Sequence, residues 1–155
     1  MTPSFPAVSG DTAWRRHLID DDVGIRALLE RTRRVAVLGI KTPESGQPAY
    51  YVAEYAKRAG YEIVPVPVYY PDVTEILGRP VYRTVPAVAA PVEMVNVFRR
   101  PRDIPPHVQD ILAARPRVVW LQLGIRHDEA AETWAKAGIQ VVQDRCLLVE
   151  HRRLR

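Results

Sequence analysis

Apolar residues occur along this chain in two alternating patterns, short continuous runs and longer stretches with helical spacing. Five continuous runs have the length of β-strands, and they lie at residues 35–38, 63–68, 94–98, 118–123 and 139–142. Continuous apolar runs are typical of strands that helices cover on both faces. We therefore expect five buried strands that pair mainly in parallel.

Stretches with helical spacing separate these runs. The acidic residues Asp20–Asp22 precede the first stretch, where negative charge favours a helix N-terminus. Pro48 has the position of a first-turn proline, and Gly60 that of a helix stop. Asp103 is expected to cap a later helix, and His127 or Asp128 to begin another. The expected helices cover about residues 22–33, 48–59, 104–115 and 128–137.

Repeated strand–helix units predict an α/β fold, namely a three-layer, Rossmann-like, doubly wound sheet. In such sheets, ligands bind at the carboxyl ends of the strands, where the strand order reverses. Four predicted loops follow strands at that edge, at residues 39–47, 67–71, 98–102 and 122–127. Residues 1–20 have weak periodicity, so we expect an N-terminal extension followed by one domain over residues 21–155.

Composition and charge limit the functional classes. The chain has 155 residues with 47% hydrophobic and 26% charged residues, as ordinary globular domains have. No apolar run reaches the roughly 18 residues of a membrane span, and residues 1–22 contain no hydrophobic signal segment. Cys146 is the single cysteine, so no disulfide can form within the chain. These features favour a cytoplasmic protein.

The net charge of +4 suits an anionic partner. The densest basic segments are Arg33-Arg34, Arg99-Arg100 and residues 151–155. A nucleic-acid surface would combine a basic stripe with interleaved aromatic residues, and the sequence has no such stripe. We therefore expect a small anionic ligand rather than a nucleic acid or a membrane.

The loop after the first strand has the layout of a phosphate site, because a strand, a glycine turn at Gly39 and a helix start follow one another. Neither the dinucleotide pattern nor the Walker pattern is present, since Gly39 and Gly46 are the only glycines in this loop. The second strand ends in apolar and aromatic residues up to Tyr70, without the acidic residue that grips the ribose in NAD sites. This surface suits an adenine ring better than a ribose diol.

Catalytic machinery is not evident in the sequence. The histidines His17, His107, His127 and His151 are scattered, and we interpret them as surface or capping residues. No pair of carboxylates has a spacing that requires acid–base chemistry, and no cysteine–histidine cluster has metal-ligand spacing. We therefore expect no catalytic residue and no metal site.

Six phrases, in order and covering about residues 30–154, resemble the small stand-alone CoA-binding proteins. That family is similar in fold to the N-terminal CoA-binding domain of the succinyl-CoA synthetase alpha subunit. The phrases are Val35–Gly39, Pro48–Ala53, Glu75–Tyr82, Val95–Pro101, Val118–Gly124 and Asp144–His151. The phosphohistidine of the synthetase belongs to a second domain, so the resemblance implies no ligase activity.

The resemblance implies a site for coenzyme A or an acyl-CoA at the carboxyl edge. It implies that Gly39, Ile40 and Lys41 approach the diphosphate and that Pro67, Val68 and Tyr69 flank the adenine. Phe98 and Arg99 would border the nucleotide or pantetheine, while Gln122, Leu123 and Gly124 would close the pocket beneath it.

Our leading hypothesis is therefore non-catalytic binding of CoA or an acyl-CoA. Two alternatives stay open at this point. One is an enzyme that uses a nucleotide cofactor, such as an NAD-type oxidoreductase or a transferase. The other is an interaction protein of the same fold that has lost its ligand and binds a protein partner.

Overall fold

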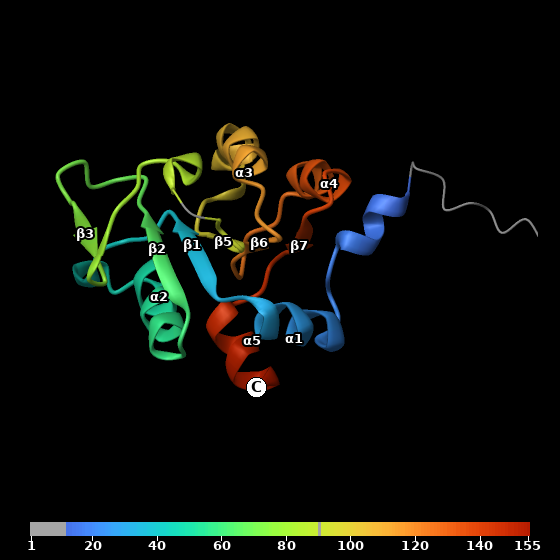
Figure 1. The fold of residues 1–155 in the computed structure, drawn as a ribbon, viewed down its shortest axis with the longest axis horizontal. Helices are drawn as coiled ribbons and strands as arrows, with labels where there is room; N and C mark the ends of the chain where they lie inside the picture. Colours follow the sequence, from blue (N-terminus) through green and yellow to red (C-terminus); the bar gives the residue numbers. More distant parts are fainter. Residues whose placement is uncertain (1–11, 90) are drawn as a thin grey trace, which may run out of the picture.

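The five apolar runs form one parallel sheet in the computed structural model, which describes residues 12–89 and 91–155. Its strands are β1 (Arg34–Leu38), β2 (Glu62–Val66), β5 (Met94–Val97), β6 (Val118–Leu121) and β7 (Gln140–Val142). Their order across the sheet is β2-β1-β5-β6-β7, and every neighbouring pair is parallel (Figure 1). The prediction of a doubly wound sheet of five mainly parallel strands is confirmed.

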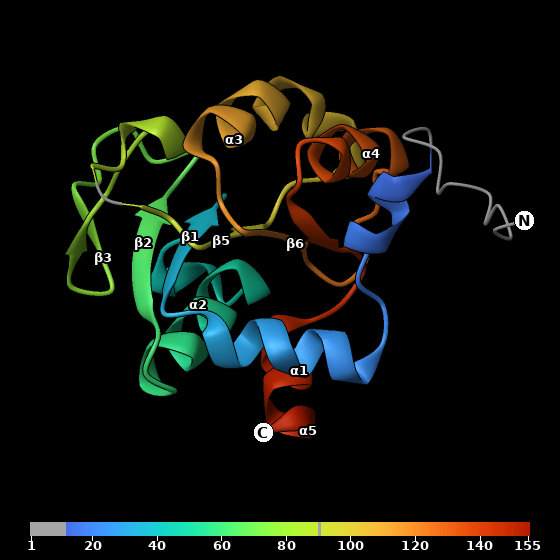
Figure 2. The same ribbon diagram turned by 45° about the vertical axis from the view of Figure 1, so that its right-hand side comes forward.

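Helices cover both faces of this sheet (Figures 1 and 2). On one face lie α1 (Asp22–Arg31), α2 (Pro48–Arg58) and α5 (Leu147–Leu154), and on the other lie α3 (Val108–Ala114) and α4 (Asp128–Lys136). Successive strand residues enter opposite cores, so Val35 and Val37 of β1 face the first layer while Ala36 and Leu38 face the second. This double burial explains the continuous apolar runs.

The helix starts follow the expected chemistry in two cases. The Asp21 side chain accepts a hydrogen bond from the Gly24 N–H (3.1 Å) at the start of α1. His127 caps α4, because its Nδ1 accepts from the Ala130 N–H at 3.0 Å. The expected capping role of Asp103 is wrong. Its carboxylate binds Arg100 at 2.9 Å, and two 3₁₀ turns, Pro101–Asp103 and Pro105–His107, precede α3.

The sequence interpretation missed a hairpin of two strands and one helix. A short antiparallel hairpin, β3 (Glu75–Ile76) and β4 (Arg79–Pro80), lies between β2 and β5. The missed helix is the C-terminal helix α5.

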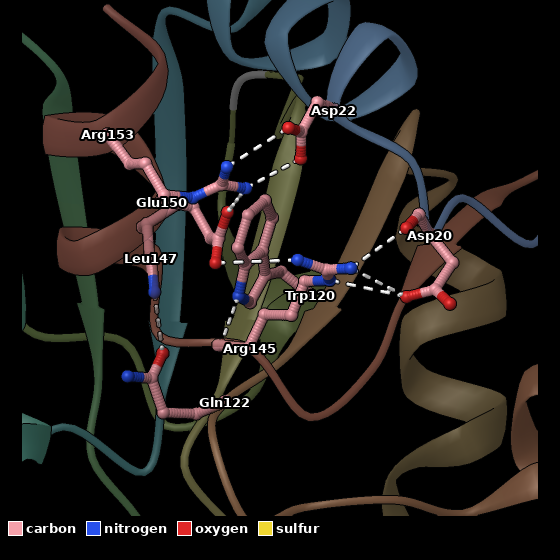
Figure 3. Close-up of polar contacts among 8 residues, drawn as sticks. All are labelled: Asp20, Asp22, Trp120, Gln122, Arg145, Leu147, Glu150 and Arg153. Carbon is pink, nitrogen blue, oxygen red and sulfur yellow. Dashed lines mark hydrogen bonds and ion pairs between the residues drawn. The ribbon is translucent and has the colours of Figure 1, made fainter.

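Charged side chains attach α5 to the region around the start of α1 (Figure 3). The Glu150 carboxylate is nearly buried and lies between Arg145 (3.4 Å) and Arg153 (2.7 Å). Arg145 also binds Asp20 at 2.9 Å, and Arg153 binds Asp22 at 2.6 Å. We call these five residues the α5 clasp. It ties the end of the chain to residues that lie about 130 positions earlier.

Residues just before α1 also contact the sheet. The 3₁₀ helix Ala13–His17 packs against α4, and Leu18 forms a parallel bridge with Val141 of the edge strand β7. The Ile19 N–H donates to the Val141 carbonyl at 2.9 Å. Most of the proposed extension, residues 1–11, lies outside the described residues, so the domain boundary near residue 20 stays a prediction.

None of the helices in the described part of the chain has the length and apolar character needed to cross a membrane.

Candidate functional site

The strand order reverses between β1 and β5, because the chain crosses from β1 outward to β2 and then returns to the other side of β1. This reversal makes the carboxyl ends of β1 and β5 the expected ligand position. Gly39 follows β1 there, and Phe98 follows β5. The two main-chain segments lie side by side at the edge.

Gly39 makes the close approach of these segments possible. Its φ of +87° is left-handed, and a Cβ atom built at this position would lie 2.4 Å from the carbonyl oxygen of Phe98. The Gly39 N–H donates to the Val66 carbonyl (2.8 Å), and the Phe98 N–H donates to the Leu38 carbonyl (2.9 Å). The ends of β2, β1 and β5 are thereby joined at one point.

Beyond Gly39, the chain turns directly into the start of α2. The Lys41 N–H donates to the Ala49 carbonyl at 3.1 Å, which fastens this loop to the first helical turn. Gln47 occupies the N-cap position without a side-chain cap, and Pro48 takes the first helical position. Because the positive end of a helix dipole favours an anion, this start of α2 is suited to a phosphate.

The Arg99 side chain contacts both Tyr69 and His107 at this edge. The Arg99 guanidinium lies over the ring of Tyr69, 5.7 Å from its centroid, and the Arg99 Nε donates to the His107 Nε2 at 3.2 Å. A Cβ atom at Gly39 would lie 3.4 Å from the Arg99 Cδ. Burial, and then the positive charge of Arg99, lower the pKa of His107 below its ordinary value. His107 is therefore neutral at pH 7 and can accept this hydrogen bond.

Arg83 orders the loop that carries Tyr69. Its guanidinium donates to the carbonyl oxygens of Tyr69 (3.2 Å), Tyr70 (3.0 Å), Pro71 (3.3 Å) and Val73 (2.6 Å). Within this loop, Tyr70 has a φ of +63°, which is uncommon for a residue with a side chain. Four hydrogen bonds from one guanidinium help to hold that conformation.

These loops surround a pocket of about 330 Å³, within the size range of small-molecule sites. It lies on the α3 side of the sheet at the ends of β1 and β2. We call it the Pro67 pocket. Its apolar wall contains Leu38, Pro67, Val68, Val85, Pro106 and Ile111, and its polar members are Arg83, Thr84, His107 and Asp110.

The structure brings most of the residues expected from the sequence to this part of the edge. Gly39 approaches Phe98 and Arg99, and Arg99 contacts Tyr69. Pro67 and Val68 line the pocket. Ile40 is buried in the core between the sheet and α2, so only its backbone can face a ligand.

The expected site residues after β6, Gln122, Leu123 and Gly124, lie elsewhere on the same edge. Gln122 is buried, and its Oε1 accepts a hydrogen bond from the Asn96 Nδ2 at 3.4 Å. The same oxygen accepts from the Leu147 N–H at 3.4 Å (Figure 3). Leu123 is exposed and lines a separate pocket of about 400 Å³ beside Cys146. These residues therefore do not enclose the Pro67 pocket.

Four polar residues of the pocket were not expected from the sequence. Arg83 and Thr84 precede a single turn of 3₁₀ helix, Val85–Ala87, which carries no recognised motif. His107 was interpreted as a surface or capping residue, but it is half-buried and hydrogen-bonded to Arg99. Asp110 follows it on α3. The sequence contains no local signal that relates these residues to Pro67.

Among the described residues, no group of three histidine, cysteine or acidic side chains is arranged to hold a metal ion.

The parallel strand order and its reversal between β1 and β5 place the chain in the class of Rossmann-like α/β domains. Residues 33–152 match the model of a family described as CoA binding domain. Because this match covers most of the chain, the protein belongs to that family.

Two relatives are similar over nearly their whole lengths. The uncharacterized protein YneT of Bacillus subtilis (strain 168) is 32% identical over 127 residues, which are 82% of this chain and 91% of YneT. A Thermus thermophilus protein of known structure, titled cell-free ID.343, is 40% identical with a TM-score of 0.80. That match covers 88% of this chain and all of the other.

A larger protein contains a similar fold. The dinucleotide-forming acetyl-coenzyme A synthetase 1 of Ca. Korarchaeum cryptofilum matches 70% of this chain and 25% of its own, with a TM-score of 0.58. At 14% identity, this likeness shows the shared fold alone. The expected similarity to synthetase CoA-binding domains is confirmed at the level of the fold.

Proposed function

We propose that this protein binds coenzyme A or an acyl-CoA without catalysing a reaction, and that it does so in the cytoplasm. Membership of the CoA-binding domain family supports the ligand class. The observation that carries the proposal is the approach of Gly39 to the Phe98 carbonyl beside the Pro67 pocket. It brings the loops after β1 and β5 together at the switch in strand order, where ligands of this fold class bind.

The parts of CoA are assigned by chemistry. The diphosphate is proposed to lie against the backbone of Gly39, Ile40 and Lys41, at the uncapped start of α2. The Lys41 side chain and Arg99 supply positive charge beside it.

The adenine is proposed to enter the Pro67 pocket, where Pro67 and Val68 offer apolar surface, with Tyr69 next to them in the chain. Thr84 and Asp110 provide oxygen acceptors for the amino group of the base. Phe98 borders the nucleotide or the pantetheine. The pantetheine is proposed to run along the carboxyl edge toward Gln122, Leu123 and Gly124, which follow the neighbouring strand β6.

The proposal of binding without catalysis is supported by the state of the polar groups at the site. His107 is hydrogen-bonded to Arg99, and Asp110 is the carboxylate that lines the pocket. No nucleophile and base within hydrogen-bonding distance of each other line the Pro67 pocket in the described part of the chain.

A thermal-denaturation panel with CoA, acetyl-CoA, NAD, FAD and ATP tests the function. At 100 times its dissociation constant, a ligand that binds only the folded state adds about 2.7 kcal/mol of stability. For a domain of this size, we expect the midpoint to rise by about 5 to 10 °C with CoA or acetyl-CoA. A clear rise with NAD or FAD but none with either CoA species would reject the proposal in favour of a nucleotide-dependent enzyme. No response to any ligand, together with a stable complex with another protein, would favour the interaction protein.

A further inference from the structure

Arg83 lines the Pro67 pocket and Arg99 contacts its lining residue His107, and neither forms an ion pair with a carboxylate of the described residues. Many arginines of the described chain form ion pairs, including Arg34, Arg79, Arg100, Arg145 and Arg153. Neither Arg83 nor Arg99 has such a partner within residues 12–89 and 91–155. Their hydrogen-bond partners are neutral carbonyl, hydroxyl and imidazole groups.

Arg83 is also held in place before any ligand arrives. Its two terminal nitrogens donate to four carbonyl oxygens of residues 69–73, so the guanidinium has little freedom to lose on binding. It lines the pocket next to Thr84, and its side chain is exposed at the pocket mouth. A fixed guanidinium with uncompensated charge is a receptor for an anion that approaches from solvent.

The rest of the lining indicates which anion this is. The wall is apolar enough for a nucleobase, and Asp110 is the carboxylate of the lining, so negative charge is disfavoured there. An anion that enters with a base must therefore project from the sugar toward Arg83. Arg99 lies on the Gly39 side, where the diphosphate is proposed, and so the two arginines address different phosphates.

We propose that Arg83 recognises a phosphate monoester on the ribose of the bound nucleotide, and thereby makes the site selective for 3′-phosphorylated CoA over its dephosphorylated form. This inference depends on the proposed CoA function and adds a residue that determines specificity. Arg83 has two linked roles, positioning the Tyr69 loop and contacting the monoester. The experiment has to separate them.

Isothermal titration with CoA and with 3′-dephospho-CoA makes that separation, because the ratio of the two dissociation constants is insensitive to a general loosening of the pocket. We expect the wild-type chain to bind CoA about tenfold or more tightly than 3′-dephospho-CoA, the range of a charge-assisted contact. Arg83→Gln should reduce this ratio toward one by weakening CoA alone. Arg31→Gln, which removes an equal charge at the exposed end of α1, should leave the ratio unchanged.

Equal affinity of the wild-type chain for both ligands would overturn the inference and leave the proposed function standing. So would an Arg83→Gln chain that weakens both ligands equally, since Arg83 would then act only through the Tyr69 loop. Binding of neither ligand by the wild-type chain would overturn the proposed function, and this inference with it.

Discussion

At the scale of single residues, the contact between Gly39 and the Phe98 carbonyl fixes the geometry of the carboxyl edge. A Cβ atom in this position would overlap backbone, not a movable side-chain tip. The strand ends would have to separate to relieve that overlap. Gly138 provides a matched comparison, because it has the same φ of +87° but no atom within 4 Å of its Cβ position.

We predict that Gly39→Ala destabilises the protein more than Gly138→Ala does. Both variants place alanine in a left-handed conformation, which costs about 1 kcal/mol. Gly39→Ala adds the overlap with Phe98, and overpacking of this kind costs a further 1–3 kcal/mol or so. Urea denaturation of the two variants measures the difference. Equal losses would show that the edge can open without strain.

His107 gives the protein a dependence on pH at the same place. Its pKa is lowered in the folded state, so the unfolded chain binds more protons near pH 6. The stability that neutral His107 contributes is complete above its unfolded pKa of about 6.5, and it is lost as the pH falls through the lowered folded value. Burial also lowers the pKa of His151 on α5. Protonation of His151 therefore also reduces stability as the pH falls.

We predict that His107→Gln reduces the loss of stability between pH 7.5 and pH 5, because glutamine keeps an acceptor for Arg99 but does not titrate. His151→Gln should remove a separate part of the loss. Urea midpoints measured across this range for wild type and both variants test the assignment. A wild-type slope that persists unchanged in His107→Gln would show that His107 titrates normally in the folded protein.

At the scale of elements, the strands were predictable and α5 was not, for a physical reason. Residues such as Val35 and Val97 are apolar because helices cover both sides of the sheet, and that requirement is visible locally. Helix α5 has eight residues, and an ion pair between its Arg153 and the distant Asp22 helps to hold it in place. Such distant partners leave no pattern in the local sequence.

The candidate site shows the same division. The loops at the carboxyl edge follow from the strand order, and so Gly39, Tyr69 and Arg99 could be expected to lie close together. Arg83 and His107 could not, because they reach the pocket from irregular segments whose path depends on the assembled fold. Leu123 was expected at the same pocket from the family resemblance, and it lines a different pocket at that edge.

The α5 clasp leads to a prediction at this scale. Glu150→Gln leaves Arg145 and Arg153 with one fewer anionic partner in a poorly hydrated position, and we expect a loss of about 1–3 kcal/mol in unfolding free energy. Glu132→Gln is the control, because Glu132 forms an exposed pair with Lys136 within α4. Exposed helical pairs contribute about 0.3–0.5 kcal/mol. Similar losses in the two variants would mean that the clasp is only a surface feature.

At the scale of the whole molecule, the fold combines a packed framework with an edge at which several loops converge. The two helical layers and the sheet form the framework, and the loops after β1, β2 and β5 converge at the switch in strand order. A net charge of +4 favours the approach of a highly anionic ligand to that edge.

The structure of the complex with CoA is the measurement that tests this account most directly. We predict that its diphosphate lies within hydrogen-bonding distance of the backbone at residues 39–41, with the adenine between Pro67 and His107. A CoA molecule whose diphosphate lies away from Gly39, or whose adenine occupies the pocket beside Cys146, would contradict it.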